Sequence, residues 1–229
     1  MDNLEVINLN KSEKFRLGNT EYLVIVIGVI LLAVVFYNTI RISDLAGTTG
    51  NTIGSILPSV SASEILPSGV PKIYGEELNI KYDDVSANNP QKADATIEVL
   101  SNFDRTMNLE GENLQRYINI ASKISCEYCC GAESIIFSNG QAACGCAHSY
   151  AMRGLAKYLI IKHGDEYTDD EILEELGKWK VLFFPGVHET KAKVLKEQGI
   201  EINYINLASN KYRGIEKGQS SGSGMVGGC

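Results

Sequence analysis

The chain has 229 residues, a formal net charge of −7 and six cysteines. Because nucleic-acid-binding domains concentrate Lys and Arg, this acidic balance argues against a nucleic-acid partner. The segment 72–207 is long enough to form one domain that buries its own core. Structural disulfides alone therefore explain the cysteines poorly.

An uncharged apolar segment at residues 22–40 predicts a single transmembrane helix near the N-terminus. At about 1.5 Å per residue, its length matches a bilayer core of roughly 30 Å. A cleavable signal peptide is the alternative, but its apolar core usually runs only about 7–15 residues. Basic residues at positions 11, 14 and 16 precede the segment. The positive-inside rule therefore places residues 1–21 in the cytoplasm and the C-terminal domain outside it.

Flexible segments are predicted on both sides of the soluble domain. Residues 41–71 are rich in Gly, Ser, Thr and Pro, which is typical of a flexible linker. Residues 72–207 form the cysteine-rich soluble domain, which we expect to be α+β and mostly helical. Residues 208–229 predict a flexible Gly/Ser tail that ends in Cys229.

The first half of the domain is predicted to contain one strand followed by two helices. Apolar residues alternate with polar ones between 73 and 85, which is the pattern of a strand. They recur at helical spacing over 91–105 and again over 111–125. We expect the second of these helices to lead into Cys126.

A hairpin is predicted between the two groups of cysteines. The short apolar strand at 134–140 ends in Asn139-Gly140, the strongest dipeptide signal for a tight hairpin turn. A turn at this point would return the chain and bring Cys144 and Cys146 beside Cys126.

The second half of the domain is predicted to contain helices and a small parallel unit. A helix is expected over 147–163, and a capping box at 168–171 predicts the start of another. Apolar segments at 181–184 and 200–205 predict two strands, with a helix over 189–198 between them. Strand, helix and strand in this order suggest a βαβ unit.

Five cysteines and one histidine fall within a short stretch in the middle of the chain. Thiolate sulfur and imidazole nitrogen are the ligands that zinc, copper(I) and iron–sulfur clusters prefer. Two short-spaced ligand groups joined by a loop are a common way for a chain to close around one ion. The spacing therefore predicts a metal ion or cluster, with zinc, copper and iron–sulfur all open. The candidate ligands are Cys126, Cys129, Cys130, Cys144, Cys146 and His148.

Cys130 and Cys229 need separate consideration. Adjacent cysteines rarely ligate one ion, so Cys130 is either a thiol outside the ligand shell or a ligand in a site with more than one metal. The tail before Cys229 has an r.m.s. reach of about 17–21 Å, which is enough to bring its thiol to the same site. The alternative for Cys229 is a cross-link to a second copy or to a protein partner.

The same cysteines have a second interpretation as redox thiols or disulfides, which an extracytoplasmic location favours. Six cysteines allow 15 complete pairings, and the sequence does not choose among them. Cys126 and Cys129 have the spacing of thiol–disulfide oxidoreductases, but they are expected at the end of a helix, where a thiolate is not stabilised. A disulfide-stapled surface interaction protein is a further alternative.

Other polar residues are expected to have structural roles. We expect His163 to cap a helix and His188 to lie at the surface. Arg153 and Lys157 are expected at solvated positions of an amphipathic helix. The sequence shows no Ser/His/Asp arrangement, paired-carboxylate motif or phosphate-binding Gly loop. Metal capture, metal delivery or electron transfer is therefore favoured over enzymatic turnover.

Part of the chain resembles known families. Cys144-Gly-Cys146-Ala-His148 resembles the signature of small bacterial surface proteins named for a PCYCGC motif. The segment that follows resembles the helix–helix pattern of the membrane-anchored thioreductase subunit of cytochrome c maturation, in which a Cys-x-x-Cys motif leads into a helix. The Cys-x-Cys-x-His at this place favours metal binding over apocytochrome reduction. The chain as a whole resembles membrane-tethered cysteine-rich proteins of archaea.

Overall fold

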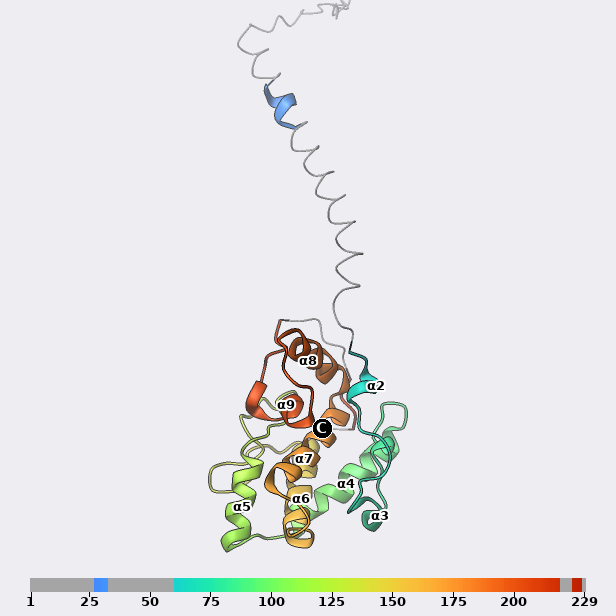
Figure 1. Ribbon diagram of the computed structural model, residues 1–229, viewed down its shortest axis with the longest axis vertical. Helices are drawn as coiled ribbons and strands as arrows, with labels where there is room; N and C mark the ends of the chain where they lie inside the picture. The colour runs from blue at the N-terminus through green and yellow to red at the C-terminus, as the bar shows by residue number, and fades with distance from the viewer. Residues whose placement is uncertain (1–26, 33–59, 219–223, 228–229) are drawn as a thin grey trace, which may run out of the picture. The chain divides into compact units, whose positions relative to one another are not determined.

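The computed structural model describes residues 27–32, 60–218 and 224–227, and its described part is mostly helical with long loops between some of the helices (Figure 1). The chain divides into two units, residues 1–57 and residues 58–229. The second unit contains α2 (Ala62–Ile65), α3 (Gly75–Leu78), the 3₁₀ helix η1 (Tyr82–Asp84), α4 (Pro90–Thr106), α5 (Gly111–Ala121), α6 (Ala147–Lys162), α7 (Asp169–Phe183), α8 (Pro185–Glu197), α9 (Tyr204–Ala208) and the 3₁₀ helix η2 (Asn210–Tyr212).

The predicted membrane span lies mostly outside the described residues. Residues 27–32, in its middle, are helical. Within the part of the chain that the structure describes, no helix has both the length and the apolar character needed to cross a bilayer. Residues 60–71, at the end of the predicted linker, include α2, whose Ile65 is buried.

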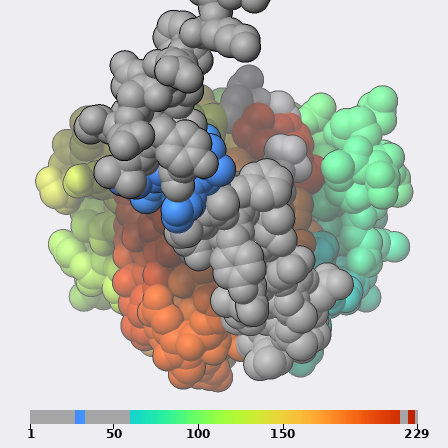
Figure 2. Space-filling view, turned by 90° about the horizontal axis from the view of Figure 1, so that it is seen from above, coloured from blue at the N-terminus to red at the C-terminus, as the bar shows by residue number. Residues whose placement is uncertain are grey.

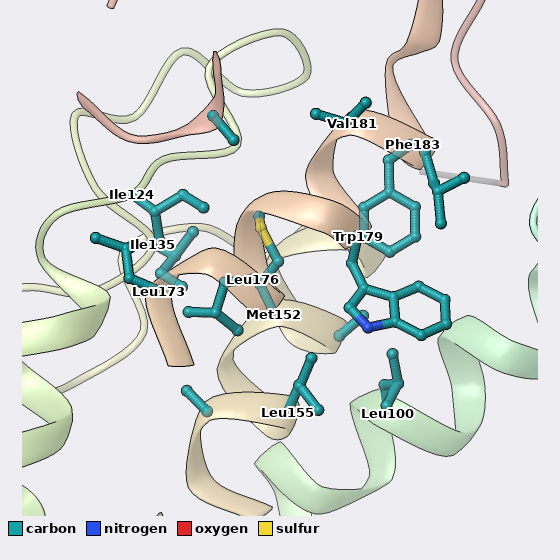
Figure 3. Close-up of a cluster of buried hydrophobic side chains, with 14 of the residues drawn as sticks. Leu100, Ile124, Ile135, Met152, Leu155, Leu173, Leu176, Trp179, Val181 and Phe183 are labelled. Carbon is teal, nitrogen blue, oxygen red and sulfur yellow. The ribbon is translucent and has the colours of Figure 1, made fainter. Parts of the chain in front are cut away.

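Helices α4, α6 and α7 form the centre of the second unit. Helix α6 has buried residues on every side, because α4 and α7 contact it from different directions. Figure 3 shows Trp179 of α7 beside Leu100 of α4 and Phe183, while Ile124 and Ile135 from the loops between helices lie near the start of α7. All of these side chains are fully buried.

The remaining helices surround this centre. Seen from above in Figure 2, the green side chains of the α4 region lie on one side, the yellow-green side chains of α5 and the following loop lie on the other, and the orange α8 and α9 lie between them. Helix α9 packs against α7 and α8, and α2 packs against α8. The cysteine-bearing loops 122–134 and 141–146 connect α5 to α6.

A glycine permits the close approach of α4 and α6. A Cβ atom at Gly154 of α6 would lie 1.9 Å from the carbonyl oxygen of Leu100 and 2.9 Å from the backbone nitrogen of Asp104, both in α4. No larger residue fits without separating the two helices. The position of α6, which begins directly after the second cysteine group, therefore depends on this contact.

The strand predicted between residues 73 and 85 is wrong, because this segment forms α3 and η1. Its alternate apolar residues are buried through local turns rather than through pairing with another strand. The hydroxyls of Tyr74 and Tyr82 both donate to Oε2 of Glu175 in α7, at 2.7 and 2.6 Å. The indole nitrogen of Trp179 donates to the Tyr74 hydroxyl at 2.7 Å. This buried network, rather than a sheet, attaches the segment to the core.

The predicted strands at 181–184 and 200–205 are also wrong, and so is the βαβ unit, whereas the expectation of a mostly helical domain is confirmed. Helix α7 continues through Phe183, and Phe184 then takes a non-helical conformation before Pro185 begins α8. Asn203 accepts a hydrogen bond from the backbone N–H of Asn206 and so starts α9. β-type pairing in the described residues consists of two isolated antiparallel bridges, so the domain is helical.

The long predicted helices are confirmed. Those expected over 91–105 and 147–163 match α4 and α6 to within one residue at each end. The capping box at Thr168 and Glu171 is present at the start of α7. The helix expected over 111–125 ends earlier, at Ala121, so a loop and not a helix leads into Cys126.

We expect Gly154→Ala to lower the free energy of unfolding by about 3 kcal/mol, because the added methyl group would overlap the α4 backbone. Gly145→Ala is the matched control, since a Cβ at that position meets nothing within 4 Å. Urea unfolding followed by circular dichroism measures both variants. Equal stabilities for the two would contradict the close contact between α4 and α6.

Candidate metal and thiol site

The two cysteine groups are brought together by short backbone pairings. The N–H of Ile135 donates to the carbonyl of Ile124 at 3.0 Å, and the N–H of Ala143 donates to the carbonyl of Ile135 at 3.1 Å. Gly140 has a φ of +83° in the turn between them, as expected for the predicted Asn139-Gly140 turn. The chain therefore returns as predicted, although only one isolated bridge forms in place of a regular hairpin.

The first cysteine group lies on a tight loop. Glu127 adopts a φ of +51°, which is uncommon for a residue with a side chain. This conformation turns the chain directly after Cys126, which is fully buried, so that Cys129 is half-buried and Cys130 is exposed. The group therefore runs from the inside of the domain, at Cys126, to its surface, at Cys130.

The cysteines are partly oxidised. Cys130 and Cys144 form a disulfide with a Cα–Cα distance of 6.7 Å. Cys129 is also disulfide-bonded, and Cys126 and Cys146 are the free thiols among the described cysteines. Cys229 lies outside the described residues, so its predicted part in the site stays a prediction.

Five sulfurs nevertheless converge in two overlapping groups of three. The Sγ atoms of Cys126, Cys129 and Cys146 lie within 4.8 Å of one another, and so do those of Cys130, Cys144 and Cys146. We call these the inner triad and the outer triad. Cys146 belongs to both, and its Sγ lies 3.2 Å from that of Cys126 and 3.5 Å from that of Cys144.

Cys146 occupies the N-cap position of α6. Its Sγ accepts a hydrogen bond from the backbone N–H of Ser149 at 3.4 Å and lies 3.3 Å from the Ser149 hydroxyl. The hydrogen bond with Cys126 is the largest cause that lowers the pKa of Cys146, and it raises the pKa of Cys126. The start of a helix also favours negative charge. A thiolate is therefore favoured at Cys146. The spacing in the sequence instead indicates Cys126 and Cys129 as the pair typical of thiol–disulfide oxidoreductases.

His148 lies beside the sulfurs, in the first turn of α6. Its Nε2 is 2.8 Å from the carbonyl oxygen of Val226, and because a carbonyl can only accept, Nε2 donates. The imidazole also forms a side-chain hydrogen bond that lowers the pKa of Cys146. Neither triad in the described part of the chain includes His148. Its role as a ligand stays a prediction.

Buried charges lie next to the inner triad. Nζ of Lys180 in α7 is 3.3 Å from a carboxylate oxygen of Glu127 and donates to the carbonyl of Ala208 at 2.8 Å. Burial lowers the pKa of Lys180 to about 8, while the negative charge of Glu127 acts in the opposite direction. Arg213 lies 4.0 Å from the same carboxylate, and Lys191 is fully buried nearby.

The sequence pattern did not indicate that these charged residues lie beside the cysteines. Lys180 follows Trp179 and precedes an apolar run, and a lysine in such a run is a signal for a buried partner. His188 was expected at the surface but is fully buried, and its Nδ1 lies 2.8 Å from the carbonyl oxygen of Phe184. Burial is the largest cause that lowers the pKa of His188, and the positive charge of Lys180 acts in the same direction.

Arg153 was expected in solvent but is buried under the second cysteine group. Its Nε donates to a carboxylate oxygen of Asp104 at 2.7 Å. Its Nη1 donates to the carbonyl of Cys144 at 2.8 Å and to that of Ile135 at 3.2 Å. Lys157 is 2.8 Å from the other Asp104 oxygen and is mostly buried as well. Both residues are therefore buried partners of Asp104 rather than solvated positions on a helix, and Arg153 also holds the backbone of the second cysteine group.

We expect Arg153→Gln to lower the free energy of unfolding by about 3 kcal/mol, because it breaks a buried ion pair and releases the Cys144 carbonyl. Arg105→Gln is the matched control: its partner Glu98 is exposed, so the loss should stay below about 1 kcal/mol. Chemical unfolding of the two variants tests this difference. Similar small losses for both would show that Arg153 does not support the site.

Comparison with protein-family models, with curated proteins and with solved structures gives no match for this chain. The chemistry of the site must therefore be inferred from its own residues.

Proposed function

We propose that this domain binds a metal ion through its thiolates and acts in metal capture, metal delivery or electron transfer. The observation that carries the proposal is the sharing of Cys146 by two groups of three sulfurs, each within 4.8 Å. Two cysteines often lie close together by chance. Five cysteines from two loops lie close together only because the backbone brings the two loops to the same place. The inner triad is the more buried and offers the better protected site.

The ligand set favours a soft ion. Each triad supplies sulfur alone, and thiolate ligands select copper(I), zinc and iron–sulfur centres over harder cations. His148 contributes through its hydrogen bond to Cys146, which orients that sulfur and stabilises its charge. Copper(I) is well matched to three thiolates, whereas zinc would need a fourth ligand.

The buried cations support an anionic centre. A metal held by three thiolates carries net negative charge, and burying that charge is costly without compensation. Three cationic residues and two carboxylates form a connected group that reaches Cys126 through Lys180, and the cations exceed the carboxylates by one. They are Lys180, Lys191, Arg213, Glu127 and Glu216.

Reduction is the condition for binding. While Cys130 and Cys144 are joined, the outer triad keeps only Cys146 as a free thiol, and Cys129 of the inner triad is disulfide-bonded too. Because a metal ligand must be a thiolate, opening these bonds completes the triads. We therefore propose a site whose metal affinity depends on redox state.

For the reduced chain we expect about one equivalent of copper(I), zinc or iron, and for the oxidised chain far less, because only two of the cysteines that the structure describes remain free thiols. Anaerobic loading, gel filtration and elemental mass spectrometry measure this stoichiometry. Cys146→Ser should weaken binding at least about tenfold, since it removes a sulfur from both triads.

Cys130→Ser is the matched control for that variant, because it removes one sulfur but leaves the inner triad intact. Its metal content should stay close to that of the unaltered chain. Absence of all three metals from the reduced chain, or equal binding by the reduced and oxidised chains, would overturn the proposal.

We also propose that the domain is tethered to a membrane by residues 22–40 and faces away from the cytoplasm. The uncharged apolar run and the basic residues before it support this topology. Protease added to intact cells should then remove the domain. Protection until the membrane is permeabilised would reverse the orientation.

A further inference from the structure

We infer that the cysteines form an internal disulfide-exchange relay, in which Cys146 passes the disulfide between the exposed Cys130 and the buried Cys126. This activity goes beyond metal binding and does not require a metal. It arises from the position of a free thiol against an existing disulfide.

The distances set the order of the relay. Sγ of Cys146 lies 3.5 Å from Sγ of Cys144, which is bonded to Cys130. On its other side Cys146 lies 3.2 Å from the free Cys126. Cys146 is therefore in van der Waals contact with both the disulfide that it would attack and the thiol that would follow it.

The environment assigns Cys146 as the attacking sulfur. It caps the N-terminus of the 16-residue helix α6, where the Ser149 N–H donates to it. Cys126 is fully buried in a loop and lacks a position of this kind. Thiol–disulfide exchange ordinarily proceeds by attack of a thiolate on one sulfur of a disulfide, which forms a new disulfide and releases the other sulfur as a thiolate.

In the first step, the Cys146 thiolate attacks Sγ of Cys144. A Cys144–Cys146 bond forms, the Cys130–Cys144 bond breaks, and Cys130 leaves as a thiolate that takes a proton from solvent. In the second step, Cys126 attacks Cys146, a Cys126–Cys146 bond forms, and Cys144 leaves with the proton that Cys126 loses. Each step breaks one disulfide and forms one, so no external oxidant or reductant is consumed.

The relay connects the surface to the interior. Cys130 is exposed, whereas Cys144 has only 6 % of its surface exposed and Cys126 none. Cys130 is the most exposed of the described cysteines, so a thiol or disulfide partner in solvent reaches it most readily, and the relay carries its redox state to the inner thiols. The partner chemistry is that of a small dithiol or of a protein with an accessible cysteine pair.

The test uses the full chain, oxidised and free of metal, and a bulky maleimide that reaches exposed thiols only. Cys130 should become labelled, because the relay releases its thiolate. Cys146→Ser should slow this labelling at least about tenfold, since serine cannot attack the disulfide. Serine is a favoured N-cap residue, so this variant should retain α6.

Cys126→Ser is the matched control, because it removes the second step but leaves the first. Its Cys130 should label at a rate close to that of the unaltered chain, and acid-quenched peptide mapping should show Cys144–Cys146 but no bond to residue 126. Equal labelling of Cys130 in the unaltered chain and in Cys146→Ser would overturn the relay. So would a Cys130 that labels after reduction but never in the oxidised chain.

Because this experiment contains no metal, its result is separate from the test of metal binding. A chain that labels as expected but holds no metal would support the relay and contradict the metal site.

Discussion

The buried ion pair between Arg153 and Asp104 is the interaction on which the cysteine site most depends. It crosses from α6 to α4, and the remaining guanidinium hydrogen bonds go to the carbonyls of Cys144 and Ile135. A charge in this position is tolerable because Nε and Nη1 have partners, although Nη2 is buried without one, and removal of one member of the ion pair would leave the other poorly compensated. The pair therefore ties the approach to the second cysteine group to the most tightly packed helices of the domain.

The capped or strongly periodic helices could be predicted from the sequence. The Thr168 capping box and the apolar spacing of α4 and α6 are local signals, and local contacts decide these elements. The strands could not be predicted reliably, because a short apolar run such as 200–205 is compatible with a strand or with a buried helical turn. In the structure residues 200–203 have no regular structure, and a short helix, α9, begins at Tyr204.

Burial of polar residues was the least predictable feature. Arg153, Lys180 and His188 are all buried, but each lies on a helix whose sequence pattern does not show which faces are buried. Which face is covered depends on distant segments: α4 covers Arg153, and the loop carrying Glu127 covers Lys180. Such pairings are separated by some fifty residues and leave no periodic signal.

The spacing of the cysteines predicted that the two groups would meet, and they do. It did not predict which sulfurs pair, since all pairings are compatible with the spacing alone. Cys130, which is surplus in a single four-coordinate site, has a partner in Cys144. We therefore propose two uses of the same sulfurs, metal binding when they are reduced and disulfide exchange when they are oxidised, with Cys146 shared by both.

The most direct measurement is X-ray absorption at the metal edge of the reduced, metal-loaded chain. Three thiolates from one triad predict a first shell of sulfur alone, at about 2.3 Å for zinc and close to that for copper(I). A first shell dominated by nitrogen or oxygen would contradict the assignment of Cys146 and its neighbours as the ligands.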